Sequence, residues 1–131
     1  MEIDDNKIFK IALITTLVGL VGLMVFSTFI SPKEVTIDEI NKGMVEEQVT
    51  IIGIIESVEK SNSNSYFLKI NDGTGKLSVI IFESTTIELE ELGTPPEIFL
   101  HEKVKITGTL TEYKSNMEII ISTGNSIKIL V

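Results

Sequence analysis

The sequence predicts one membrane-spanning helix followed by an all-β domain, a small barrel. Residues 11–30 contain no charged side chain. Two long runs of strand-forming residues each contain one glycine, Gly53 in the first and Gly108 in the second, and a glycine inside a strand marks a bend, a bulge or a close backbone approach. Between these runs, residues 71–75 read Asn-Asp-Gly-Thr-Gly, and such residues tolerate the positive φ of a hairpin turn.

The composition restricts the chemistry of the chain. Its 131 residues suffice for one small domain and an appendage. It has no cysteine, which excludes disulfides, thiolate metal sites and a cysteine nucleophile. The net charge is −8, and all eleven basic residues are lysines. Because lysine and arginine neutralise phosphates in non-specific nucleic-acid binding, this balance disfavours nucleic acid as a partner without excluding it.

The uncharged run predicts a transmembrane helix, since about 20 apolar residues cross a hydrocarbon core of roughly 30 Å. A cleaved signal peptide is the alternative, but its apolar core is usually about 7–15 residues and ends at a small-x-small site. No such site is present, which favours an uncleaved signal anchor. We therefore expect a polar tail at residues 1–10, a transmembrane helix at 11–31 and a barrel domain at 32–131, with the lipid bilayer as partner of residues 11–30.

The orientation of the span is less strongly encoded. Lys7 and Lys10 precede it, and Lys33 and Lys42 follow it, so the basic residues counted by the positive-inside rule almost balance. The short tail resembles the n-region of a signal anchor. This favours a single-pass protein of the cell membrane with a cytoplasmic N-terminus and the barrel outside.

The remaining elements follow in order. Thr36 is a candidate N-cap and Gly43 a candidate stop, which predicts one short helix between them. Residues 85–92 predict a second short helix because their apolar side chains fall at positions 87, 89 and 92. The expected strands lie at residues 49–58, on both sides of the turn within 66–83, and at 104–113, 117–122 and 127–131.

Five strands with a helix between the third and fourth form the OB-fold, a Greek-key barrel. The predicted fold class is therefore an all-β, five-stranded OB-fold barrel with one N-terminal transmembrane helix. Four runs carry a family resemblance: Val-Thr-Ile-Ile-Gly-Ile-Ile at 49–55, Phe-Leu-Lys-Ile-Asn-Asp-Gly-Thr-Gly at 67–75, Val-Ile-Ile-Phe at 79–82 and Val-Lys-Ile-Thr-Gly at 104–108. They resemble the nucleic-acid-binding OB domain of the anticodon-binding type, found in aminoacyl-tRNA synthetases, exonucleases and replication proteins.

The resemblance implies a binding site. The family binds single strands across its second and third strands, with aromatic side chains stacked on bases. It implies a stacking role for Phe67, and period-2 alternation puts Lys69 and Asn71 on the same face. A strand phase shifted by one would instead bury Phe67 in the core. The candidate nucleic-acid-binding residues are Phe67, Lys69, Asn71, Lys76, Ser78, Tyr113 and Lys114.

No catalytic, cofactor or metal site is predicted. His101 is the single histidine and stands near the place, before the fourth strand, where the family often has a glycine. It lacks the partners of a catalytic triad or a transition-metal site. The turn around Gly73 is too short for a phosphate-binding loop, and Asp72 is interpreted as a hydrogen-bond acceptor of the turn. We expect no enzyme.

Two functions remain. The first is a membrane-anchored OB-fold module that binds single-stranded nucleic acid through the face of its second and third strands. The alternative is an extracytoplasmic protein-interaction or scaffolding domain without nucleic-acid binding, whose partner would be another membrane or envelope protein.

Overall fold

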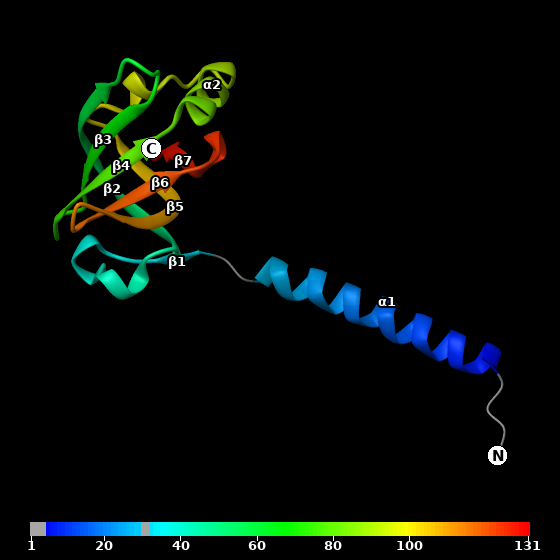
Figure 1. Ribbon diagram of the computed structural model, residues 1–131. Helices are drawn as coiled ribbons and strands as arrows, with labels where there is room; N and C mark the ends of the chain where they lie inside the picture. The colour runs from blue at the N-terminus through cyan, green and yellow to red at the C-terminus, as the bar shows by residue number, and fades with distance from the viewer. Residues whose placement is uncertain (1–4, 30–31) are drawn as a thin grey trace. The chain divides into compact units, whose positions relative to one another are not determined.

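In the computed structural model, which describes residues 5–29 and 32–131, the chain forms two compact units, Met1–Ser31 and Pro32–Val131. The first contains helix α1 (Asp5–Phe29) (Figure 1). The helix therefore begins inside the predicted polar tail, six residues before the predicted span. The first four residues of that tail and the predicted end of the span, residues 30–31, lie outside the described residues.

Two threonine hydroxyls of helix α1 hydrogen-bond to the backbone of the same helix. The hydroxyls of Thr15 and Thr16 donate to the carbonyl oxygens of Ile11 and Ala12, each at 2.8 Å. Its segment Asp5–Leu23 is long and apolar enough to cross a membrane, and none of that segment is buried against other described residues.

The second unit is a β-barrel. Its strands are β1 (Lys33–Glu34), β2 (Gln48–Lys60), β3 (Tyr66–Asn71), β4 (Lys76–Ile81), β5 (Lys103–Tyr113), β6 (Asn116–Ile121) and β7 (Ile127–Ile129). They follow the order β1-β2-β3-β4-β6-β5-β7, and pairing of β2 with β5 closes the barrel (Figure 1). Helix α2 (Glu83–Glu91) lies between β4 and β5 in the chain. Strands β2 to β6 and α2 confirm the predicted OB-fold, to which β1 and β7 are additions.

The prediction of a helix between Thr36 and Gly43 is wrong. Two 3₁₀ turns occupy the segment, η1 (Ile37–Glu39) and η2 (Lys42–Met44). Thr36 makes no side-chain cap on the backbone, because its hydroxyl hydrogen-bonds to the nearby carboxylates of Asp38 and Glu39. Burial of Ile37 in the barrel core, rather than local propensity, sets the path of this segment.

Alternate strand side chains fill the barrel. The core includes Ile51, Ile55, Tyr66, Leu68, Ile70, Val79, Ile81, Val104, Ile106, Leu110, Ile119 and Ile121, joined by Leu89 of α2 and Phe99 of η3 (Pro96–Phe99).

The hydroxyl of Tyr66 donates to the carboxylate of Glu97. Burial and this hydrogen bond raise the pKa of Tyr66 to about 12, and the same bond lowers the pKa of Glu97.

Each long strand changes its partner near its glycine. Strand β2 pairs with β5 up to Ile54 and with β3 from Ile54 onward. Strand β5 pairs with β2 up to Thr109 and with β6 from Thr109 onward. A Cβ atom at Gly53 would lie 2.7 Å from the carbonyl oxygen of Asn71, and one at Gly108 would lie 2.4 Å from that of Ile120. The two glycines therefore permit the crossings that close the barrel, as predicted from their positions.

His101 adopts a backbone conformation that favours glycine. Its φ is 66°, in the left-handed region. Its backbone N–H donates to the carbonyl oxygen of Ile55 at 2.7 Å. The chain turns tightly here before it enters β5. This turn explains why members of the family that the sequence resembles often have a glycine near this position.

Asp72 joins the hairpin turn to the N-terminal segment of the barrel. Its carboxylate accepts hydrogen bonds from the backbone N–H groups of Thr74 at 2.9 Å and Gly75 at 3.2 Å, which confirms its predicted role in the turn. It also accepts from the N–H of Ile37, thirty-five residues away, at 2.8 Å. Burial raises the pKa of Asp72, but the hydrogen bonds from Thr74, Ile37 and Gly75 outweigh it, so the net pKa is lowered.

We predict that Asp72→Asn destabilises the barrel by about 1–2 kcal/mol at neutral pH, because the amide nitrogen cannot accept the Ile37 hydrogen bond. A lowered pKa stabilises the fold above the unfolded value of about 3.9, and this contribution is lost as the pH falls through the lower folded value. The difference between wild type and variant should therefore shrink in acid. Urea unfolding of residues 32–131 at neutral and acid pH measures it. Asp38→Asn, at an exposed carboxylate nearby, is the control, and a difference independent of pH would contradict the prediction.

Candidate nucleic-acid interface

Strand β3 presents the predicted residues to the outside of the barrel. Phe67 is 45% exposed, whereas its neighbours Tyr66 and Leu68 are each 2% exposed. Lys69 and Asn71 follow Phe67 at the half-buried alternate positions. The predicted strand phase is therefore confirmed, and the alternative in which Phe67 fills the core is excluded.

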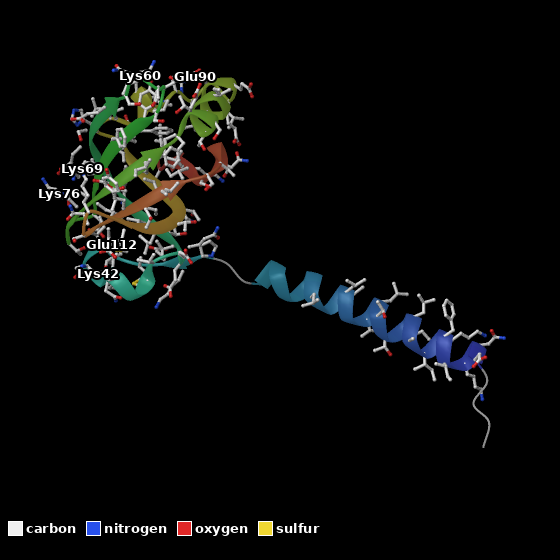
Figure 2. All side chains as sticks on the ribbon, viewed as in Figure 1. Lys42, Lys60, Lys69, Lys76, Glu90 and Glu112 are labelled. Atoms are coloured by element: carbon white, nitrogen blue, oxygen red, sulfur yellow. The ribbon has the colours of Figure 1, made fainter. Side chains whose placement is uncertain are left out.

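Strand β4 continues this face. In the antiparallel register Phe67 is opposite Ile80, Lys69 is opposite Ser78 and Asn71 is opposite Lys76. The Nζ atom of Lys69 donates to the hydroxyl of Ser78 at 3.3 Å. Five of the seven candidate residues thus lie together on β3 and β4, and Figure 2 shows Lys69 and Lys76 projecting from the same side of the barrel.

An apolar groove of about 360 Å³ crosses this face. We call it the aromatic groove, and it is lined by Phe67, Ile80, Phe82, Thr111, Glu112, Tyr113, Glu118 and Ile120. Its three aromatic side chains are about half exposed, at 45% for Phe67, 50% for Phe82 and 59% for Tyr113. Such exposed rings can stack on a planar ligand.

A second hollow of about 380 Å³ adjoins the groove. We call it the lysine pocket, and it is lined by Ile37, Ile40, Lys69, Lys76, Leu77, Ser78, Asn116, Met117 and Glu118. Because Glu118 of β6 lines both hollows, the two meet at that residue. The face therefore combines an apolar surface for rings with lysines that suit an anion.

Tyr113 reaches the aromatic groove through a tight hairpin between β5 and β6. Tyr113 pairs with Asn116, which leaves Lys114 and Ser115 as a two-residue loop. Both loop residues have positive φ, 49° and 67°, as a type I′ turn requires. The ammonium of Lys114 lies 5.4 Å from the centre of the Tyr113 ring. The structure thus places Tyr113 with Phe67 in the groove and Lys114 over the ring of Tyr113.

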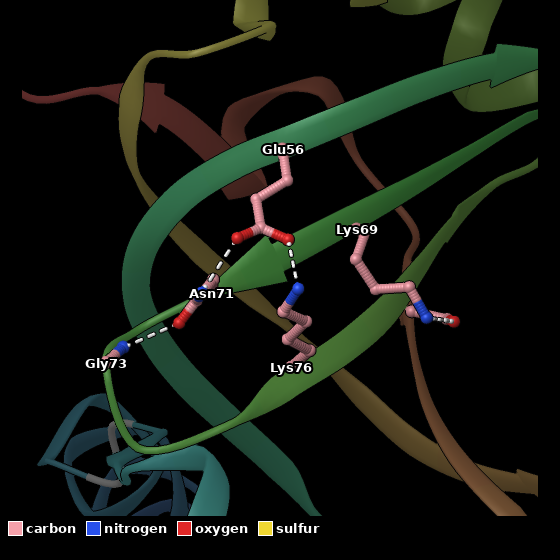
Figure 3. Close-up of polar contacts among 6 residues, drawn as sticks. Glu56, Lys69, Asn71, Gly73 and Lys76 are labelled. Carbon is pink, nitrogen blue, oxygen red and sulfur yellow. Dashed lines mark hydrogen bonds and ion pairs between the residues drawn. The ribbon is translucent and has the colours of Figure 1, made fainter.

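Glu56 of β2 contacts two of the candidate residues. One carboxylate oxygen accepts from the amide nitrogen of Asn71 at 2.8 Å, and the other lies 3.0 Å from Nζ of Lys76 (Figure 3). The side-chain oxygen of Asn71 accepts from the backbone N–H of Gly73 at 2.8 Å. The hydrogen bonds from Asn71 and Lys76 lower the pKa of Glu56, so the carboxylate is ionised at neutral pH.

Comparison with known proteins identifies the domain. The family described as OB-fold nucleic acid binding domain, of the tRNA anticodon type, matches residues 49–127. The chain belongs to this family. An uncharacterized protein of Methanocaldococcus jannaschii is 32% identical in an alignment of 138 positions that covers 99% of this chain. The chain spans 66% of that relative's length, just under two thirds.

Solved structures share the fold of this OB-fold domain. Aspartyl-tRNA synthetase from Entamoeba histolytica matches with a TM-score of 0.63 and 24% identity, over 75% of this chain and 21% of that protein. Asparaginyl-tRNA synthetase from Pyrococcus horikoshii matches with a TM-score of 0.57 and 14% identity, over 76% and 23%. An OBody bound to hen egg-white lysozyme matches with a TM-score of 0.59 and 22% identity, over 77% and 97%. At these identities the likeness shows the fold alone.

Sequence reasoning missed several residues on the face of the OB-fold domain. The apolar positions Ile80, Phe82 and Ile120 belong to the uninterrupted runs Val-Ile-Ile-Phe at 79–82 and Ile-Ile-Ile at 119–121. A strand with one solvated face alternates apolar and polar residues, so these runs were a usable signal for an apolar outer surface. Glu56 had no such signal, because the structure places it at an irregularity in the pairing of β2 with β3.

Proposed function

We propose that the chain is a membrane-anchored OB-fold module that binds single-stranded nucleic acid across the outer face of β3 and β4. The observation that carries this proposal is the adjacency of the aromatic groove and the lysine pocket. A base stacked on an aromatic ring contributes about 1–3 kcal/mol. Lys69, at the junction between Phe67 and the lysine pocket, would contact the phosphate. Membership of a nucleic-acid-binding family supports the same assignment.

The face suits an unpaired strand rather than a duplex. Bases of a duplex are stacked on one another, so their faces cannot reach Phe67, Phe82 and Tyr113. The groove is also lined by Glu112 and Glu118, and the whole chain carries a charge of −8. Few phosphate contacts against this background imply modest affinity that falls with added salt.

Helix α1 supports the membrane anchor. Exposed apolar side chains run along its described length: Ile8, Phe9, Ile11, Leu13, Ile14, Leu17, Val18, Leu20, Val21 and Leu23. Water solvates such a surface poorly, whereas a bilayer accommodates it. The proposal therefore places a single-strand-binding barrel at a membrane surface.

Titration of the full chain tests the binding proposal. The protein, held in nanodiscs of uncharged lipid, is titrated with a short labelled single strand at low and at moderate salt. We expect binding at low salt, weaker binding at moderate salt and weaker binding still to a duplex of the same sequence. Absence of binding to the single strand at low salt would refute the proposal.

The second candidate function is an extracytoplasmic protein-interaction domain. Glu112 and Glu118 in the groove favour it, and so does the tail that resembles a signal-anchor n-region. The OBody that shares this fold is bound to a protein, hen egg-white lysozyme, which supports protein binding by a barrel of this type.

The side of the membrane on which the barrel lies separates the two functions. The chain has no cysteine, so Asn62→Cys, in the exposed loop before β3, gives a single site for an impermeant maleimide. Labelling only after permeabilisation of the cells would place the barrel in the cytoplasm and support nucleic-acid binding. Labelling of intact cells would end that proposal and support the protein-interaction domain.

A further inference from the structure

We propose that Glu56 is a built-in competitor for the phosphate of the bound strand. In the structure its carboxylate lies between Asn71 and Lys76, at the position that a phosphate would take. This inference rests on the proposed nucleic-acid binding, and it makes Glu56 one of the residues that lower the affinity for the strand.

A local irregularity of β2 places Glu56 over its neighbours. Ile55 pairs with Ile70 and Ser57 pairs with Lys69. Ile55 and Ser57 are two positions apart on β2 but pair with adjacent residues of β3. This leaves Glu56 as the extra residue of a β-bulge. A bulge redirects a side chain that regular pairing would place elsewhere. The carboxylate of Glu56 then reaches Asn71 at the end of β3 and Lys76 at the start of β4 (Figure 3).

The two partners of Glu56 are groups that bind phosphates. The Asn71 amide donates one hydrogen bond to Glu56, and the Lys76 ammonium forms an ion pair with its second oxygen. A phosphate also has charged oxygens that accept from amides and ammonium groups. While Glu56 stays in place, neither partner is fully available to a strand. Lys69 differs, because its ammonium donates to the uncharged hydroxyl of Ser78 and acts on Glu56 only through a weaker charge interaction.

The competition is reversible because the contacts lie at the surface. The side chain of Lys76 is 58% exposed and that of Glu56 is 36% exposed, and exposed ion pairs contribute little to stability. A strand could therefore displace Glu56 from Lys76. The carboxylate would then remain near the incoming phosphate and repel it. Glu56 should thus weaken binding without preventing it.

Glu56→Gln tests the inference, with Glu59→Gln as its matched control. Each variant removes one negative charge from β2, but Glu59 is exposed and lies opposite Phe67 rather than over Lys76. The full chain in uncharged nanodiscs is titrated with labelled oligodeoxythymidylate over a series of salt concentrations. We expect Glu56→Gln to bind about fivefold more tightly than Glu59→Gln.

The salt dependence gives a second readout. In Glu56→Gln the phosphate contact of Lys76 no longer replaces an existing ion pair, so the slope of log K against log salt should steepen by about 0.7. The slope for Glu59→Gln should remain that of the wild type. Adding Lys76→Gln to Glu56→Gln should remove both the gain in affinity and the steeper slope.

The outcomes separate this inference from the proposed function. If the wild type binds but Glu56→Gln and Glu59→Gln show the same affinity and slope, Glu56 is no competitor while the binding proposal stands. If neither the wild type nor any variant binds at low salt, the binding proposal fails and this inference fails with it. Thermal unfolding of each variant verifies that the barrel is intact.

Discussion

Gly108→Ala is expected to destabilise the barrel by about 3 kcal/mol, the upper part of the usual range for overpacking a well-packed site. The added Cβ would lie 2.4 Å from the carbonyl oxygen of Ile120 and 2.9 Å from a side-chain carbon of Ile119. The nearer atom belongs to the backbone of β6, so no rotation of a side chain relieves the clash. Strands β5 and β6 must separate where β5 changes partner.

The sign of this effect is informative. Gly→Ala at a compatible position stabilises a protein by about 0.4–1 kcal/mol because the unfolded chain loses freedom. Urea unfolding of residues 32–131, followed by the near-ultraviolet circular dichroism of Tyr66 and Tyr113, measures the change. Thr111→Ala on the same strand is the control for alanine in β5. A Gly108→Ala variant as stable as the wild type would show that β5 and β6 do not approach each other as closely as the structure indicates.

The glycines illustrate what the sequence encodes well. A glycine inside a strand has few explanations, and Gly53 and Gly108 occur at comparable places in two long runs. Their shared role at the barrel crossings could therefore be predicted. Period-2 alternation alone left two strand phases open for Phe67, and the outward phase was the one that the family resemblance implied.

Features that depend on distant contacts could not be predicted. The turns after Thr36 follow from the burial of Ile37 and its hydrogen bond to Asp72, which no local pattern reveals. The bulge at Glu56 is a property of the pairing of β2 with β3. The aromatic groove depends on the parallel pairing of β4 with β6, because this pairing puts Ile80 next to Ile120. That contact forms only when the barrel closes.

Phe67→Ala is expected to weaken binding of a single strand by about five- to 150-fold, since one lost base–aromatic stack costs about 1–3 kcal/mol. The substitution removes the ring that is central to the face and half exposed. Because much of that ring already contacts water, the stability of the barrel should change little. Phe67→Tyr, which keeps a ring for stacking, should retain most of the affinity.

The salt dependence distinguishes stacking from charge. Stacking involves no ion release, so Phe67→Ala should lower affinity at every salt concentration and leave the slope of log K against log salt unchanged. Lys69→Gln should instead reduce the magnitude of that slope by about 0.7, as expected for one lost phosphate contact on a single strand.

The control for the loss of apolar surface is Ile87→Ala, at a 44% exposed residue of α2 outside the groove. It should bind as the wild type does. If Phe67→Ala also binds a single strand as tightly as the wild type, base stacking on this face is excluded. The exposed rings of Phe67, Phe82 and Tyr113 would then be better explained as the contact surface of a protein partner, because aromatic side chains are enriched at the centres of such interfaces.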